Sequence, residues 1–248
     1  MSEKYTRKKT LYDPQSKEPY KFSRTRLENF LKCPRCFYLE LRLGVKPPSG
    51  LPFTLNAAVD HLLKKEFDSY RAQKKIHPLM ERYGIKAIPF QHENLNDWRN
   101  NFKGMRYLHK KTNFLVFGAI DDVWEDNDGK LSIVDYKATA KESALSLNEE
   151  WHASWKRQME IYQWLFRQNG FDISDMGYFV YCNGKKDREG LNCKLEFDIE
   201  IHSYQGNDNW IESALEKARA CLDGDSIPDY TVDCDFCTYQ QSLKSIVH

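Results

Sequence analysis

Two aspartates and a lysine lie on neighbouring segments whose patterns predict the two strands of a β-hairpin. Residues 114–124 are rich in aromatic and branched side chains, and residues 131–138 read LSIVDYKA. Because successive side chains of a strand point to opposite faces, Asp121 falls in an otherwise apolar row with Leu115, Phe117, Ala119 and Val123. Asp135 and Lys137 share one face of the second strand for the same reason. Whether the acidic groups meet depends on the turn.

The turn sequence Asn127-Asp128-Gly129 sets the register of this hairpin. These residues suit a type I turn closed by a glycine in the left-handed conformation. Counting outward from such a loop places Asp121 opposite Asp135. A two-residue loop of Asp128-Gly129 is the alternative, and it would place Asp121 opposite Tyr136 instead.

Opposed acids at this point of the hairpin would form a metal site. Directly opposed residues have Cβ atoms about 4.5 to 5.5 Å apart, so the carboxylates of Asp121 and Asp135 would converge beside Lys137. Burying two ionised carboxylates is costly unless a cation compensates them. A hard divalent ion such as Mg²⁺, held by carboxylates and a substrate phosphate, is the usual cation. Lys137 would then stabilise negative charge as an in-line displacement at phosphorus proceeds.

A helix expected over residues 151–168 adds two polar groups to this chemistry. Gln158 and Tyr162 lie four residues apart and therefore on one helical face. An amide and a phenol that point together can position a phosphate or a water molecule beside a metal ion.

Four of the seven cysteines form two close pairs, Cys33 with Cys36 and Cys234 with Cys237. This pattern suits a reducing compartment and a bound metal better than a disulfide framework. Four thiolates fit either tetrahedral zinc or a 4Fe–4S cluster. Either centre would join the two ends of the chain, and its role would be structural because metal binding is coupled to folding.

The composition excludes a membrane-spanning protein and a chain disordered throughout. The 248 residues are 41% hydrophobic and 29% charged, and they include 28 Tyr and Phe residues for a core. No apolar run approaches the ~18 to 20 residues that a membrane helix needs. The first 20 residues contain no apolar stretch of a secretion signal, so we expect a cytoplasmic location. The net charge of +1 neither favours nor excludes a polyanionic partner.

The remaining patterns predict one α/β domain over residues 21–248 that follows a flexible tail of 20 residues. A first helix begins at Ser23 or Thr25. A longer helix over 55–71 has His61 roughly opposite an apolar stripe of Leu55, Val59, Leu62, Leu63 and Phe67. Two further strands and a last helix follow the helix at 151–168. Helices alternating with antiparallel strands predict a sheet flanked by helices.

Taken together, these segments resemble the PD-(D/E)XK nuclease superfamily, and within it the RecB-like branch that includes the CRISPR-associated exonucleases with a cysteine cluster. The matching pieces follow the family's order along the chain: SRTRLENFLKCPRCFYL, the helix with His61, GAIDDV, IVDYK, QMEIY and the C-terminal cysteines. Each piece alone is a weak signal, whereas all of them in this order are specific.

The resemblance implies a fold, a reaction and a role for each site residue. The fold would be a restriction-endonuclease-like core with a central mixed sheet. His61, Asp121, Asp135 and the backbone carbonyl of Tyr136 would bind Mg²⁺ or Mn²⁺. Lys137 would be the catalytic lysine, with Gln158 and Tyr162 as a supporting motif. The reaction would be hydrolysis of DNA phosphodiester bonds, from or near ends or on single strands, in DNA repair, recombination or CRISPR adaptation.

Two alternative functional hypotheses for the same residues stay open. The chain could be a catalytically inactive nucleic-acid-binding module, or an interaction subunit that works with a helicase or a CRISPR integrase. The related nucleases combine one N-terminal cysteine with three near the C-terminus, whereas this chain has two and two, which favours zinc. We expect no membrane partner.

Overall fold

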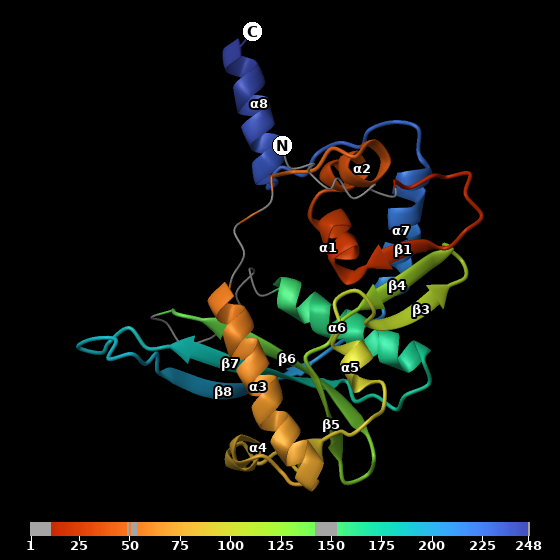
Figure 1. The fold of residues 1–248 in the computed structure, drawn as a ribbon. Helices are drawn as coiled ribbons and strands as arrows, with labels where there is room; N and C mark the ends of the chain where they lie inside the picture. Colours follow the sequence, from red (N-terminus) through yellow and green to blue (C-terminus); the bar gives the residue numbers. More distant parts are fainter. Residues whose placement is uncertain (1–10, 49, 51–53, 142–152, 248) are drawn as a thin grey trace, which may run out of the picture. The chain divides into compact units, whose positions relative to one another are not determined.

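The computed structural model describes residues 11–48, 50, 54–141 and 153–247 (Figure 1). The chain forms two compact units: unit 1 combines residues 1–50, 108–116 and 210–248, and unit 2 combines residues 51–107 and 117–209. The fold is mixed α/β with helices beside mixed sheets, as the sequence predicts. None of the helices described is both long and apolar enough to cross a membrane.

The elements of unit 1 come from both ends of the chain: β1 (Tyr20–Ser23), α1 (Arg24–Lys32), α2 (Pro34–Leu43), α7 (Ile211–Asp223) and α8 (Asp235–Val247). Unit 2 holds α3 (Thr54–Gln73), α4 (Pro78–Arg82), β2 (Ala87–Pro89), α5 (Leu95–Trp98), β5 (Asp122–Asp126), β6 (Leu131–Thr139), α6 (Ala153–Gln168), β7 (Met176–Gly184) and β8 (Phe197–Gln205). The strands β3 (Met105–His109) and β4 (Phe114–Gly118) complete the structure. One sheet has the order β1-β4-β3, and the other has the order β2-β5-β6-β7-β8.

The packed part of unit 1 begins earlier than the expected tail of 20 residues allows. Tyr12 is buried, and its hydroxyl donates to a carboxylate oxygen of Asp223 at 2.5 Å. The N–H of Tyr12 also donates to the carbonyl of Leu41 at 2.8 Å. The expected tail is therefore too long, because burial of this aromatic ring anchors the chain well before residue 20. Residues 1–10 of that tail lie outside the described part.

The first helix begins where one of the two candidate caps predicts. The hydroxyl oxygen of Ser23 accepts a hydrogen bond from the N–H of Arg26 at 3.3 Å, so Ser23 is the N-cap of α1. Behind it, Phe22 stacks on Phe114 with ring centroids 4.2 Å apart and meets Phe37 edge to face. These three buried aromatic rings form the centre of unit 1.

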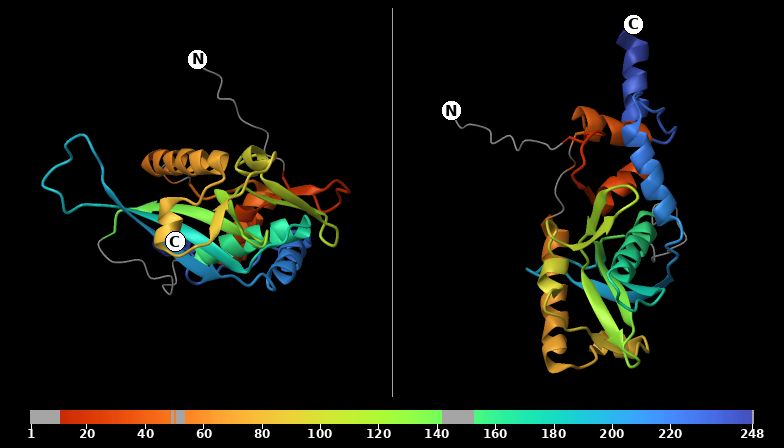
Figure 2. Two further views of the ribbon diagram at one scale, coloured as in Figure 1. Left: turned by 90° about the horizontal axis from the view of Figure 1, so that it is seen from below. Right: turned by 90° about the vertical axis from the view of Figure 1, so that its right-hand side faces the viewer.

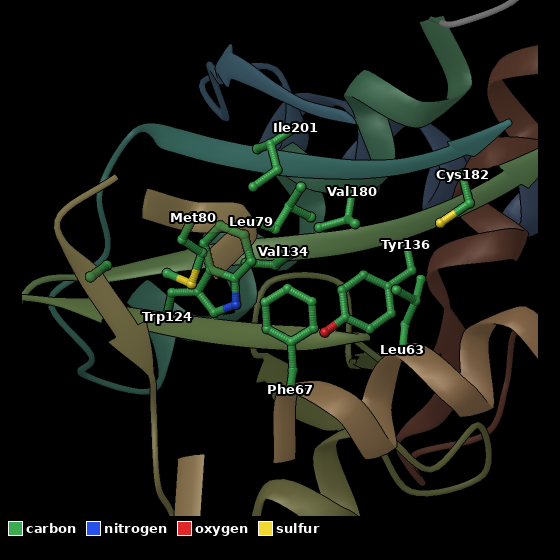
Figure 3. Packing of buried hydrophobic residues seen from close by; sticks show 11 residues of the cluster. Leu63, Phe67, Leu79, Met80, Trp124, Val134, Tyr136, Val180, Cys182 and Ile201 are labelled. Carbon is green, nitrogen blue, oxygen red and sulfur yellow. The ribbon is translucent and has the colours of Figure 1, made fainter. Parts of the chain in front are cut away.

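The core of unit 2 lies between α3 and the five-stranded sheet (Figure 3). Leu63 and Phe67 of α3 are buried against Tyr136 of β6 and Trp124 of β5, and the Phe67 ring stacks on Trp124 at 5.5 Å. The expected apolar stripe is only partly correct, because its members Leu55 and Leu62 are exposed. Burial of about 150 to 250 Å² by each aromatic side chain makes this cluster a main source of stability.

The hairpin of β5 and β6 has the register expected from a three-residue turn. Val123 pairs with Ile133, and Glu125 pairs with Leu131, in antiparallel alignment. The turn closes through Gly129, whose φ of 80° lies in the left-handed region. Continued by one residue beyond the paired segment, this register places Asp121 opposite Asp135.

The segment 114–124 is two strands rather than the one that its pattern suggests. It divides into β4 and β5, and these belong to different sheets. Between them the N–H of Ile120 donates to the carbonyl of Trp98 at 3.1 Å, so the backbone leaves the strand pairing there. The expected apolar row is wrong as well: Phe114 and Val116 are buried, whereas the alternate residues of β4 are only half-buried.

Two helices cover opposite faces of the five-stranded sheet (Figure 2). The strands β6 and β7 run parallel, and α6 connects them. The helix α6 lies on one face of β6 and α3 on the other, so alternate residues of β6 face different helices. Because β5 begins only at Asp122, the end of β6 beyond Asp135 pairs with β7 alone. This open edge of β6 lies between the two helices.

Candidate active site and metal centre

Four of the predicted site residues form one connected cluster on β6 and α6. Asp135 is 1% exposed and forms an ion pair with Lys137. The Nε2 group of Gln158 donates to Asp135 Oδ1 at 2.8 Å, while its Oε1 accepts from Lys137 Nζ at 3.2 Å. The same Nε2 lies 3.2 Å from the hydroxyl oxygen of Tyr162. A single glutamine amide therefore fixes both the acid and the lysine.

The ammonium group of Lys137 also faces an aromatic ring. Its Nζ lies 5.3 Å from the centroid of Trp155, one turn before Gln158 on α6. A cation over an indole ring is favourable because the ring face carries partial negative charge. Lys137 is thus held by an acid, an amide and a ring, with a side chain 15% exposed.

Asp121 lies just before β5 and reaches the open edge of β6. Its Oδ2 accepts from the N–H of Tyr136 at 2.9 Å, and its Oδ1 lies 3.0 Å from Lys64 Nζ of α3. Burial raises the pKa of Asp121, but the charges of Lys64 and Lys137 together with the Tyr136 N–H outweigh burial and lower it. Asp121 is therefore an ionised ligand candidate at neutral pH.

On α3 the structure brings Asp60, rather than His61, to these acids. Lys64 Nζ lies 2.8 Å from Asp60 Oδ2 and thereby bridges Asp60 and Asp121. Burial and the nearby charge of Asp121 raise the pKa of Asp60. His61 is exposed, since it lies about 100° around the helix from Asp60. Its role as a metal ligand stays a prediction.

The two half-buried acids line a cavity of about 380 Å³ at this edge. Asp60 and Asp121 contribute carboxylates to its wall, and Lys137 and Trp155 border it from β6 and α6. Tyr136, whose backbone carbonyl is a predicted ligand, also lines this cavity. The cavity therefore combines acidic groups, a lysine and an aromatic ring within unit 2.

The donor set of this site fits a hard divalent cation. Asp60, Asp121 and Asp135 offer carboxylate oxygens, the ligands that Mg²⁺ and Mn²⁺ prefer. In the structure each carboxylate is paired with a lysine ammonium, Lys64 for the first two and Lys137 for the third. Across the described residues, the four-cysteine group is the one set of three or more ligand atoms that converge within 4.8 Å. The predicted trio of His61 and the two opposed aspartates does not converge to that degree.

A buried acid beside Asp121 was absent from the sequence prediction. Asp122 is 0% exposed, and its Oδ1 accepts from Arg99 Nη2 at 3.0 Å and forms an ion pair with Arg71. Its Oδ2 accepts from the hydroxyl group of Tyr136 at 2.8 Å. Burial and the Asp122 charge raise the pKa of Tyr136 well above its ordinary value, so the phenol stays a donor.

This network also holds the backbone of the candidate site. Arg99 Nε donates to the carbonyl of Asp121 at 2.9 Å, and its Nη1 donates to both oxygens of Asp68 at 2.9 Å. The two residues that bind Asp122, Arg71 and Arg99, come from α3 and from the segment after α5. No local pattern links residues so far apart in sequence, whereas the spacing of Asp60 and Lys64 on one helical face was a detectable signal.

The four paired cysteines meet in unit 1, as the sequence predicts. Cys33 and Cys237 have sulfur atoms 3.8 Å apart, and Cys36 lies 3.6 Å from both Cys234 and Cys237. The four sulfur atoms all lie within 4.8 Å of one another. Cys33 is the N-cap residue of α2, and Cys237 lies in the first turn of α8, so the cluster joins the N-terminal and C-terminal regions.

The cysteine thiols differ in pKa, and therefore in how readily each forms the thiolate that binds a metal ion. Partial burial raises the pKa of Cys33, but N–H groups of Cys36 and Thr231 and neighbouring thiols outweigh it and lower the pKa to about 7. Burial raises the pKa of Cys237 to about 11, and the pKa of Cys36 also rises through burial and its neighbours. Several thiolates at this spacing require a cation between them.

Comparisons with known proteins agree with the chemistry of the first site. Acids and a lysine beside a cavity suit metal-assisted hydrolysis at phosphorus. Residues 52–242 match the PD-(D/E)XK nuclease superfamily, and the chain belongs to that superfamily. Membership implies a phosphodiester hydrolase with a nucleic-acid substrate, and such enzymes typically use a divalent metal ion.

The other comparisons add little. No curated protein sequence matches the chain. A solved structure titled "Crystal structure of SSO0001" is similar at 16% sequence identity and a TM-score of 0.41, over 92% of this chain and 87% of that one. A similarity of this size supports no inference about function.

Proposed function

We propose that this chain is a divalent-metal-dependent deoxyribonuclease of the RecB-like branch. The observation that carries the proposal is the contact of one amide with both Asp135 and Lys137, opposite Asp121 in the hairpin register. An acid and a lysine placed two residues apart on one strand face act on the same phosphate only if something fixes both. Gln158 does so.

Each residue has a separate task in this proposal. Asp121 and Asp135, with Asp60 beside them, would hold a Mg²⁺ or Mn²⁺ ion, and the carbonyl of Tyr136 and His61 remain predicted ligands. When bound, such an ion supplies Lewis acidity and a water molecule of lowered pKa. Lys137 stabilises the negative charge that develops on the phosphate oxygens.

The supporting helix keeps this lysine in place. Gln158 holds Lys137 and Asp135 together, while Tyr162 contacts Gln158 at 3.2 Å and limits its rotation. Trp155 covers Lys137 and excludes water from one side of its ammonium group. Cutting from or near DNA ends, or on single strands, remains our expectation for the substrate.

A cutting assay on end-labelled single- and double-stranded DNA tests the proposal, with Mg²⁺ or Mn²⁺ added. We expect cutting by the wild-type chain and none by Lys137→Ala, with circular dichroism as the check that the variant is folded. Lys130→Ala is a matched control, since Lys130 is exposed in the turn of the same hairpin. Absence of cutting with either metal while DNA binding is retained would identify an inactive nucleic-acid-binding module instead.

A second arm of the assay addresses partners and pathway. Cutting that requires a co-purified helicase or CRISPR integrase would indicate a subunit of a repair or adaptation complex. Cutting by the isolated chain would make it a nuclease by itself. The cysteine usage is consistent with a reducing, cytoplasmic location for either case.

For the cysteine site we propose a single zinc ion rather than a 4Fe–4S cluster. Zinc–sulfur bonds of about 2.3 Å in a tetrahedron separate the sulfur atoms by about 3.8 Å. The sulfur–sulfur separations of 3.6 to 3.8 Å in three of the cysteine pairs agree with this value. A 4Fe–4S cluster places four irons and four sulfides between the thiolates, and so holds the cysteines further apart.

Elemental analysis of protein purified without oxygen tests this assignment. We expect about one zinc per chain and no broad absorption near 400 nm, the region of iron–sulfur charge transfer. Iron and sulfide in equal amounts, together with that absorption, would contradict it.

A further inference from the structure

Lys64 occupies an unusual position among the charged groups of the cavity. Its Nζ lies 2.8 Å from Asp60 Oδ2 and 3.0 Å from Asp121 Oδ1, so it bridges the two acids that line the cavity. Asp60 and Lys64 are one helical turn apart on α3, whereas Asp121 lies just before β5. The Lys64 side chain is 20% exposed, which leaves it a path to solvent.

The net charge of the site also favours release of Lys64 when a divalent ion binds. Asp60, Asp121 and Asp135 carry three negative charges, and Lys64 and Lys137 carry two positive charges. The set thus carries a net charge of −1. A divalent ion added to all five groups would leave an excess positive charge in a partly buried cavity, whereas release of Lys64 would restore neutrality.

The contacts of Asp121 also favour release of Lys64 when a divalent ion binds. The Lys64 ammonium contacts one oxygen of Asp121, and the Tyr136 N–H occupies the other. A divalent ion that binds Asp121 through its Oδ1 meets the ammonium at that oxygen, where the two cations repel each other.

We propose that Lys64 is the resident cation of the site, which neutralises Asp60 and Asp121 in the metal-free protein and is displaced when a divalent ion binds. This inference rests on the proposed metal-dependent function. It makes the lysine a competitor of the metal, so the chain binds divalent ions more weakly than its carboxylates alone would.

Metal affinity measured on the full chain tests the inference, with Mn²⁺ as the probe and the signal of free Mn²⁺ in electron paramagnetic resonance as the readout. We expect Lys64→Met to bind Mn²⁺ about tenfold more tightly than the wild type, because two ion pairs no longer compete. Lys64→Arg keeps the charge and should stay near the wild type. Lys65→Met is the matched control, since Lys65 is the exposed neighbour on α3. An unchanged or weaker affinity of Lys64→Met overturns the inference.

A second measurement needs no variant that could fail to fold. Lysine-selective reductive methylation, mapped by mass spectrometry, should modify Lys64 of the wild type more rapidly after Mn²⁺ is added, while Lys65 reacts at an unchanged rate. No increase at Lys64 with Mn²⁺ bound overturns displacement.

The same binding measurements distinguish a failure of the proposed metal site from a failure of the proposed role of Lys64. Wild-type protein that binds no Mn²⁺ at millimolar concentration, or binds it equally well after Asp121→Asn, would contradict the metal site itself. Wild-type binding that Asp121→Asn abolishes, combined with no effect of Lys64→Met, would contradict only the role of Lys64.

Discussion

Replacement of the buried Asp122 by alanine should destabilise the fold strongly. The carboxylate is 0% exposed and pairs with both Arg71 and Arg99, whose side chains are 3% and 9% exposed. It also accepts hydrogen bonds from the Tyr136 hydroxyl and the Val123 N–H. Asp122→Ala removes all four contacts and leaves the two guanidinium groups with Asp68 as their shared acid.

The expected magnitude follows from the burial of these charges. Removal of one partner of a buried ion pair costs about 3 to 5 kcal/mol, because the remaining charge stays desolvated. For a chain of this size each kcal/mol lowers the melting temperature by about 2 to 4 °C. We therefore expect a decrease of about 6 to 20 °C for Asp122→Ala.

Denaturant unfolding followed by tryptophan fluorescence and circular dichroism measures this change. Asp122→Asn keeps the volume and an acceptor oxygen, so it should lose less stability than Asp122→Ala. Asp128→Asn, an exposed turn acid of the same hairpin, should change stability by less than about 0.5 kcal/mol. A decrease in the free energy of unfolding below about 1 kcal/mol for Asp122→Ala would refute the reasoning, since the arginines left without their buried acid should destabilise the fold by more than that.

Three further predictions follow from other parts of the structure. Gly104→Ala should lower the free energy of unfolding in denaturant by more than about 2 kcal/mol, because φ is 61° and a Cβ would lie 2.4 Å from a backbone oxygen. Gly170→Ala, at φ 85° with open space around it, should lower it clearly less. Equal losses in the two variants would exclude the steric explanation. Cys234→Ser should contain no bound metal in elemental analysis and should melt at a lower temperature, whereas the control Cys193→Ser, at an exposed cysteine, should do neither. A stable, metal-free and fully active Cys234→Ser protein would disprove the structural role of the cysteine site. Gln158→Ala should cut DNA about 10- to 100-fold more slowly with its circular dichroism unchanged, and undiminished cutting would show that the amide does not position the catalytic groups.

Short-range sequence patterns predicted the hairpin and the residues that β6 and α6 contribute to the site. The turn 127–129 is a short-range feature, and its glycine admits the left-handed conformation, so a three-residue loop places Asp121 opposite Asp135. The strand pairing in the structure excludes the alternative two-residue loop, which would place Asp121 opposite Tyr136. Gln158 and Tyr162 are close because any helix places residues four apart on one face. The metal-binding chemistry of the cysteine pairs likewise followed from residue type and spacing.

The groups that complete the site depend on tertiary packing, which short-range patterns do not predict. Whether Asp60 or His61 faces the acids depends on the rotation of α3, and this rotation follows from the packing of Phe67 against the sheet. The sheet to which β4 belongs, and hence the break before β5, depends on strand pairings distant in sequence. Asp122 is buried because arginines from two other segments reach it, and no local pattern encodes such contacts. Periodicity and turns are properties of neighbouring residues, whereas packing and ion pairing are properties of the whole fold.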